Sequence, residues 1–238
     1  MLQHVLGKAG IEFDGRHFEY LGVPTQDTNA LAVSKVSGVA SMEQWLSSRT
    51  PLKFGGVGPG AATDDITKVV RVTLGLPIQL VSGYKGTAEI RLAINSGEVN
   101  GITNSWESFK STWMKEVESG ALVVLALGVP KRHPAIPNVP LIIDFVKNED
   151  AKKLVQVAVH DYSAIARPYV LLPNTPKDRL WLLRKALADT YNDPEFVADA
   201  QKARLDMNPI TGEDLEKVVA RTYALEKPLV EKLRDMLK

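Results

Sequence analysis

The chain has 238 residues, a formal net charge of +1 and no cysteine. This composition excludes disulfide frameworks, thiolate metal sites and cysteine nucleophiles, and the near-zero charge gives no electrostatic reason to expect nucleic acid or an acidic membrane as a partner. Hydrophobic residues make up 45% and charged residues 24%, which is typical of a globular protein and not of a disordered chain or a coiled coil.

No export signal and no membrane span is expected within the sequence. The first residues lack a basic start followed by an apolar run of sufficient length. The longest apolar run, residues 121–129, is about half as long as a spanning helix requires. We expect it to be a strand buried on both faces.

Strand and helix patterns alternate through the first half of the chain. Strands are expected at residues 17–23, 30–35, 52–56, 78–82, 100–104 and 122–127. Helices are expected at residues 41–48 (with Ser41 as the cap), 62–74, 87–95 and 106–113. Short apolar strands that alternate with helices predict an α/β fold with a mostly parallel sheet.

The second half of the chain is mainly helical. Residues 128–140 carry four prolines and are expected to form a surface connection. A helix at 148–160 and a strand at 166–173 are expected to follow. Helices are then expected at residues 177–191, 194–204, 212–224 and 228–237, with Thr211 as a cap.

Two glycine-bearing turns, residues 54–64 and 81–89, each lead from an expected strand into an expected helix. A helix start presents unpaired N–H groups and the positive end of the helix dipole, so the pair predicts a site for a small carboxylate or phosphate. The first turn is neither a P-loop nor a regular G-x-G-x-x-G, because no Gly-Lys-Ser/Thr follows and the third glycine, Gly60, comes one residue early. For Gly55 and Gly56 the alternative is a purely structural need for close packing or positive φ.

The sequence offers little for bond-making chemistry. Its four histidines are scattered without metal-ligand spacing, so no metal site, no cofactor and no catalytic residue is predicted. Asp64 and Asp65 are expected in the first turn of a helix, where they complement its dipole. Together with Glu107 they are the only candidate bases for the rival interpretation, an enzyme that acts on a small anionic substrate.

Several segments together resemble one family. They are residues 83–101 (GYKGTAEIRLAINSGEVNG), 105–108 (SWES), 132–140 (RHPAIPNVP), 167–169 (RPY) and 192–196 (NDPEF). In this order they resemble the extracytoplasmic solute receptors of tripartite tricarboxylate transporters. The resemblance covers nearly the whole chain from about Phe13.

The resemblance implies a two-lobed fold of the periplasmic-binding-protein type II class. Lobe two would comprise residues 32–164, and residues 1–31 with 165–238 would form lobe one and the C-terminal helices. Members of the family usually begin with an export signal and the first strands of lobe one. We therefore expect a truncated chain with an incomplete lobe one, whose exposed sheet edge favours a homodimer.

The resemblance also implies a function: a non-enzymatic, periplasmic receptor that holds a small organic acid between its lobes and closes to signal to the membrane permease subunits of the transporter. For Tyr84, Thr87, Ser105 and the Thr28–Asn29 pair, plain packing, capping or turn chemistry is the alternative. A truncated, self-associating fragment without binding is a further alternative for the whole chain. The expected ligand-binding residues are Thr28, Asn29, Gly58, Pro59, Gly60, Ala61, Ala62, Thr63, Tyr84, Gly86, Thr87 and Ser105.

Overall fold

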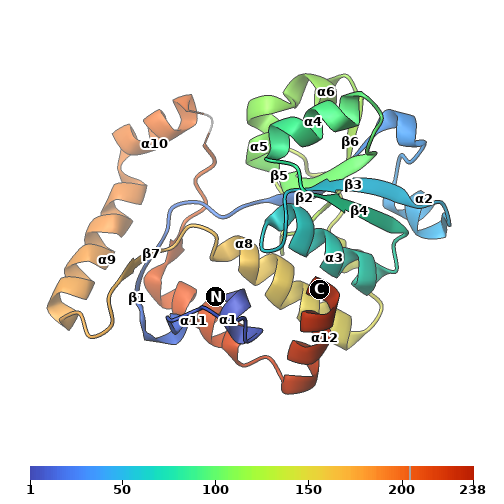
Figure 1. Ribbon diagram of the computed structural model, residues 1–238. Coiled ribbons are helices and arrows are strands. Elements are labelled where there is room, and N and C mark those ends of the chain that lie inside the picture. Colours follow the sequence, from blue (N-terminus) through green and yellow to red (C-terminus); the bar gives the residue numbers. More distant parts are fainter. Residues whose placement is uncertain (204) are drawn as a thin grey trace. The chain divides into compact units, whose positions relative to one another are not determined.

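The computed structural model describes residues 1–203 and 205–238 and divides into two compact units (Figure 1). Unit 1 comprises Met1–Asp27 and Asp161–Val230, and unit 2 comprises Thr28–His160 and Glu231–Lys238. The lobe boundaries that we expect from the sequence, at 31/32 and 164/165, remain a prediction. Among the described residues, no helix is long and apolar enough to cross a membrane.

Unit 2 is built on a five-stranded sheet in the order β4-β3-β5-β2-β6. Its strands are β2 (Asn29–Ser34), β3 (Leu52–Gly56), β4 (Ile78–Ser82), β5 (Gly101–Ser105) and β6 (Leu122–Leu127). β3 pairs in parallel with β4 and β5, whereas β2 is antiparallel to both β5 and β6. Four strands therefore run in one direction and β2 runs against them, so the mostly parallel sheet expected from the sequence contains one reversed strand.

Helices cover both faces of this sheet. α3 (Ala62–Leu74) lies on one face, where Thr67 Oγ1 is 2.6 Å from Thr103 Oγ1 of β5. α4 (Thr87–Asn95) and α5 (Trp106–Thr112) lie on the other and share one buried cluster that includes Ile90, Ile102, Trp106 and Phe109. Figure 1 shows this layering, with α3 below the strands and α4 and α5 above. Neighbouring positions along β3 and β5 therefore face different helices.

Shorter elements complete unit 2. They are α2 (Met42–Ser47), α6 (Met114–Glu118), α7 (Glu149–Val155) and 3₁₀ turns at Lys35–Ser37 and Ile142–Phe145. Ser41 caps α2 as expected, accepting a hydrogen bond from the Gln44 N–H. The single helix expected at 148–160 is wrong in detail, because the chain changes to a π-helix at Gln156–Asp161. β6 is an edge strand in which Val123 and Val124 are only half-buried, so burial of that strand on both faces is also corrected.

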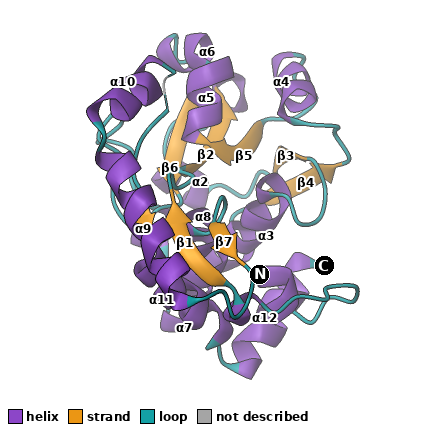
Figure 2. Ribbon diagram, turned by 90° about the vertical axis from the view of Figure 1, so that its left-hand side faces the viewer, coloured by secondary structure: helices purple, strands orange, loops and turns teal. Residues whose placement is uncertain are grey.

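Unit 1 is built on a small antiparallel sheet in the order β7-β1-β8, formed by β1 (Glu19–Val23), β7 (Tyr169–Leu171) and β8 (Ile210–Thr211). Pro168 and Pro173 bracket β7, so this strand is shorter than the expected 166–173. Figure 2 shows α9 alongside β1. The helices are α1 (Leu2–Val5), α8 (Tyr162–Ala164), α9 (Lys177–Asn192), α10 (Pro194–Lys202) and α11 (Gly212–Tyr223), and α12 (Lys227–Leu237) begins in unit 1 and ends in unit 2.

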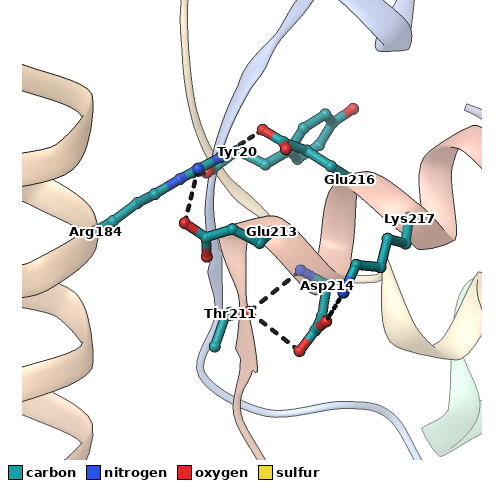
Figure 3. Close-up of polar contacts among 7 residues, drawn as sticks. All are labelled: Tyr20, Arg184, Thr211, Glu213, Asp214, Glu216 and Lys217. Atoms are coloured by element: carbon teal, nitrogen blue, oxygen red, sulfur yellow. Dashed lines mark hydrogen bonds and ion pairs between the residues drawn. The ribbon is translucent and has the colours of Figure 1, made fainter. Parts of the chain in front are cut away.

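One arginine connects three elements of unit 1 (Figure 3). Arg184 of α9 donates from Nε to the Tyr20 carbonyl of β1 at 2.7 Å and from Nη1 to Glu213 of α11 at 2.9 Å, and it also pairs with Glu216. Thr211 caps α11 by accepting the Asp214 N–H at 3.2 Å, as predicted. Since the guanidinium is held by a backbone carbonyl and two carboxylates, it fixes α9 and α11 against β1.

Candidate functional site

The loops predicted to bind a ligand lie at one edge of the five-stranded sheet. β3, β4 and β5 end at this edge, and β2, which runs the other way, begins there. Asn29 at the start of β2 pairs with Ser105 at the end of β5. The fold therefore brings both glycine turns, Ser105 and the Thr28–Asn29 pair to the same edge, where ligands bind in open α/β sheets.

The first glycine turn is packed tightly between two helices. A side chain at Gly55 would come within 2.5 Å of Ile90 Cγ2 of α4, and one at Gly56 within 2.5 Å of Asp64 Oδ2 of α3. Both glycines are therefore required by close packing, which supports the structural alternative for this pair. Gly60 has a φ of +92°, a conformation that glycine adopts without strain.

The carboxylate of Asp64 is the centre of this turn. It is fully buried, and its Oδ2 accepts hydrogen bonds from the Gly58 N–H at 2.8 Å and the Thr63 hydroxyl at 3.0 Å. Its Oδ1 accepts from the Ser82 hydroxyl at the end of β4. The turn is therefore held to the neighbouring strand by a charge-assisted network.

Asp65 also accepts a hydrogen bond from the turn, because its Oδ1 accepts the Gly60 N–H at 3.1 Å. The N–H groups of Gly58 and Gly60, which we expected to bind a ligand, thus donate to the protein's own carboxylates. Ala61 donates its N–H to the Gly58 carbonyl at 3.1 Å, and Pro59 has none to give. The N–H groups of Ala62 and Thr63 belong to the first turn of α3, where no intrahelical acceptor exists. They are the donors of this loop that suit an anion.

The second glycine turn is tied to the first by backbone hydrogen bonds. The N–H groups of Gly83 and Tyr84 both donate to the Gly56 carbonyl, at 3.0 and 3.2 Å. Gly86 precedes α4 with extended backbone, and no side chain caps this helix. The first-turn N–H groups of α4, beginning with Thr87, therefore face the same loop region without an intrahelical acceptor.

The Tyr84 hydroxyl donates to Glu98 Oε1 at 2.7 Å. Partial burial, followed by this hydrogen bond and the negative charge of Glu98, raises the pKa of Tyr84 to about 12. The raised pKa means that folding favours the neutral phenol. Its stabilising contribution is complete below the ordinary tyrosine pKa, near 10, and disappears as pH rises through about 12.

We expect Tyr84→Phe to reduce the loss of stability between about pH 10 and pH 12. The measurement is the urea midpoint of both proteins across that range. The two curves should differ most below pH 10, where wild type retains the hydrogen bond, and converge toward pH 12. Curves that stay parallel throughout would show that Tyr84 does not titrate as described.

Ser105, Thr28 and Asn29 are held mainly by local structure. Ser105 caps α5 by accepting the Ser108 N–H at 3.2 Å. The Thr28 carbonyl accepts the Trp106 N–H at 2.7 Å, and its N–H donates to Glu107 Oε2 at 3.3 Å. These contacts support the capping and turn alternatives. All three residues nevertheless lie at the edge of the sheet where β3, β4 and β5 end.

Sequence reasoning missed Asn104, the last buried residue of β5 before Ser105. Its Oδ1 accepts the Ser105 N–H at 3.0 Å, whereas its buried Nδ2 has no partner among the described residues. Trp106 Nε1 and Glu107 Oε1 are likewise buried without a partner there. The available signal was an asparagine near the end of an expected strand, directly before the predicted Ser105, since an amide that becomes buried there needs hydrogen-bond partners.

The three candidate bases of the rival interpretation are engaged within the protein. Among the described residues no three histidine, aspartate or glutamate side chains gather as a metal site would require. Asp64 and Asp65 are engaged by turn N–H groups, and Glu107 by Thr28. The arrangement is suited to holding an anion by backbone donors and a neutral amide.

Comparison with known proteins gives a match in structure only. No family model matches the sequence, and no curated protein matches it. A TctC solute-binding protein from Polaromonas has a TM-score of 0.73 at 18% identity, over 97% of this chain and 74% of that one. The chain has the TctC solute-binding-protein fold.

Two further structures share the TctC fold with this chain. Rpa4515 from R. palustris, solved with adipate, has a TM-score of 0.64 at 19% identity, over 96% of this chain and 72% of that one. MatC from Rhodopseudomonas palustris, solved with bound malate, has a TM-score of 0.60 at 13% identity, over 98% of this chain and 74% of that one. The fold class predicted from the sequence, and its resemblance to the tricarboxylate receptors, are confirmed by these structures.

Proposed function

We propose that the chain is a non-enzymatic receptor for a small organic carboxylate. The proposal rests mainly on the N-termini of α3 and α4, which have no side-chain cap and lie at the same edge of the sheet. At this edge the buried Nδ2 of Asn104 has no hydrogen-bond partner among the described residues. Backbone N–H groups at helix starts and a neutral amide stabilise a carboxylate without a cationic side chain. Adipate and malate in the related structures are ligands of this class.

The proposal includes the setting that the family resemblance implies. The receptor would act in the periplasm, close its two lobes on the ligand and present the closed form to the permease subunits of a tripartite tricarboxylate-type transporter. A ligand that binds only the closed form shifts the population toward it, and this shift is the signal. The expected ligand-binding residues of the sequence remain proposals, with Asn104 added to them.

The test is a thermal-shift screen of the chain with adipate, malate, citrate and aromatic acids at two protein concentrations. One acid should raise the melting temperature by several degrees in a saturable way, since binding to the folded state alone stabilises it in proportion to ligand occupancy. Asn104→Asp should abolish the shift, because it places a negative charge beside the bound carboxylate. Asn148→Asp is the matched control, since Asp caps α7 as well as Asn does.

Two results would contradict the proposal. One is the absence of any shift in the wild-type chain, which would favour the non-binding fragment. The other is an equal shift in wild type and Asn104→Asp, which would place binding elsewhere in the molecule.

A further inference from the structure

Unit 1 contains a cavity of about 320 Å³ between α9, β1, β8 and the start of α11. One side of it is formed by six residues of α9: Trp181, Arg184, Lys185, Ala188, Tyr191 and Asn192. They recur every three to four positions, so they form one stripe along the helix. At 1.5 Å per residue this stripe is about 16 Å long. The volume is in the range of sites that bind small molecules.

The wall opposite this stripe is mainly apolar. Leu21 of β1 and Ile210 of β8 line it together with Pro209. On the helix side, Ala188 is exposed and contributes only a methyl group at the middle of the stripe. An apolar group that displaces water from between these residues gains free energy in proportion to the surface it covers. The middle of the cavity therefore suits the apolar part of a ligand.

Trp181 gives the cavity an aromatic end. Its side chain is 67% exposed, whereas the other three tryptophans of the chain are at most 2% exposed. None of the aromatic contacts between described residues includes the Trp181 ring. Aromatic rings prefer to stack on, or meet edge to face with, a second ring. The indole is therefore available to a ring of a ligand.

The charged side chains that line the cavity already have partners of opposite sign. Arg184 Nη1 is 2.9 Å from Glu213 Oε1, and Arg184 also pairs with Glu216 (Figure 3). Lys185 Nζ is 2.6 Å from Asp189 Oδ2. A ligand carboxylate would lose hydration here without meeting an unpaired cation, and two glutamates share one arginine beside it. An uncharged ligand avoids both costs.

We propose that this cavity binds a small uncharged molecule with an aromatic ring, which packs between the α9 stripe and Ile210 and meets the indole of Trp181. All lining residues belong to unit 1, whereas the candidate carboxylate site lies in unit 2. The two sites also differ in chemistry, because one presents backbone donors to an anion and the other presents apolar walls. The inference therefore does not depend on the proposed function.

The test is a titration of the isotope-labelled chain with 3-phenylpropan-1-ol, followed by nuclear magnetic resonance. Probes of this size typically bind in the millimolar range, so the titration extends to about 20 mM. The indole N–H of Trp181 and the methyl groups of Ile210 should shift along one saturable curve, while the other three indole N–H groups stay in place. The matched probe 3-phenylpropanoate, which has a carboxylate in place of the alcohol, should bind at least tenfold more weakly.

Two variants of α9 place the binding in the cavity. Ala188→Phe adds a ring at the middle of the stripe, where it occupies the space of the probe, so binding should weaken at least tenfold. Ala186→Phe is the matched control, because it makes the same exchange on the same helix at a residue that does not line the cavity. It should bind like wild type. Both alanines are exposed, so neither exchange overpacks the core.

The backbone resonances of α11 show whether unit 1 is folded in each variant, and Ala188→Leu decides the case if Ala188→Phe does not fold. Wild-type resonances that do not move, or that move without saturation, overturn the proposal. Equal binding by the Ala188 and Ala186 variants also overturns it, since the probe would then lie on another surface. If both probes bind equally well, the assignment to uncharged ligands is wrong.

Discussion

Asp64→Ala should lower the free energy of unfolding of unit 2 by about 3 kcal/mol, because it removes a fully buried carboxylate that accepts three hydrogen bonds. In the folded chain these donors are the Gly58 N–H and the hydroxyls of Thr63 and Ser82. Without Asp64 the buried Thr63 hydroxyl loses this acceptor, and the glycine turn loses its side-chain link to β4. The measurement is urea denaturation followed by emission of Trp45, Trp106 and Trp113, which all lie in unit 2.

Asp150→Ala is the matched control for this substitution. Asp150 also lies in the first turn of a helix of unit 2, but it is exposed, so the loss should be at most about 0.5 kcal/mol. Asp64→Asn should fall between the two, because the amide keeps one acceptor oxygen. If Asp64→Ala and Asp150→Ala cost the same, the carboxylate network does not stabilise the turn.

The second large effect is expected for Gly212→Ala in unit 1. A β-carbon at this position would lie 2.2 Å from the Tyr20 carbonyl oxygen and 2.6 Å from Arg184 Nε. Both atoms belong to the hydrogen bond that fixes α9 against β1, so the strand and the arginine must separate. We expect a loss of about 3 kcal/mol, at the upper end of the cost of overpacking.

Hydrogen exchange of the backbone amides of α11 measures this loss in unit 1 directly. These amides should exchange faster by about two orders of magnitude, as about 3 kcal/mol of lost local stability implies. Gly86→Ala is the matched control, since it has extended backbone and no atom within 4 Å of the added carbon. Unchanged protection of α11 in Gly212→Ala would show that β1 can move away from the helix at little cost.

Most elements of unit 2 could be predicted because their sequence signals are local. β3, α3, β4, α4 and β6 have the expected limits, since each apolar run or helical pattern ends at a glycine, a capping residue or a polar turn. The π-helix at Gln156–Asp161 could not be predicted in this way, because a single rare π-helical turn is too short to set a period of its own in the sequence. β8 is only two residues long and exists through its pairing with β1.

The sequence predicted where the candidate site lies, but not which hydrogen-bond donors there are engaged and which have no partner. Strand order placed both glycine turns at one edge, as the alternating pattern implied. The Ser82 hydroxyl, however, meets Asp64 across 18 residues of sequence, and no local pattern reveals that contact. The same holds for the unused Nδ2 of Asn104, since its lack of a partner depends on the packing of α4 and α5 over β5.

The two prolines beside β7 have a consequence for solubility. Pro168 and Pro173 stand directly outside or close to the ends of the strand, and neither can donate a backbone hydrogen bond. Any ladder that forms on this edge therefore stops after a few residues and cannot lengthen into a fibril-like stack. We expect replacement of both prolines to turn a short, self-limiting edge with apolar flanks into a more aggregation-prone one.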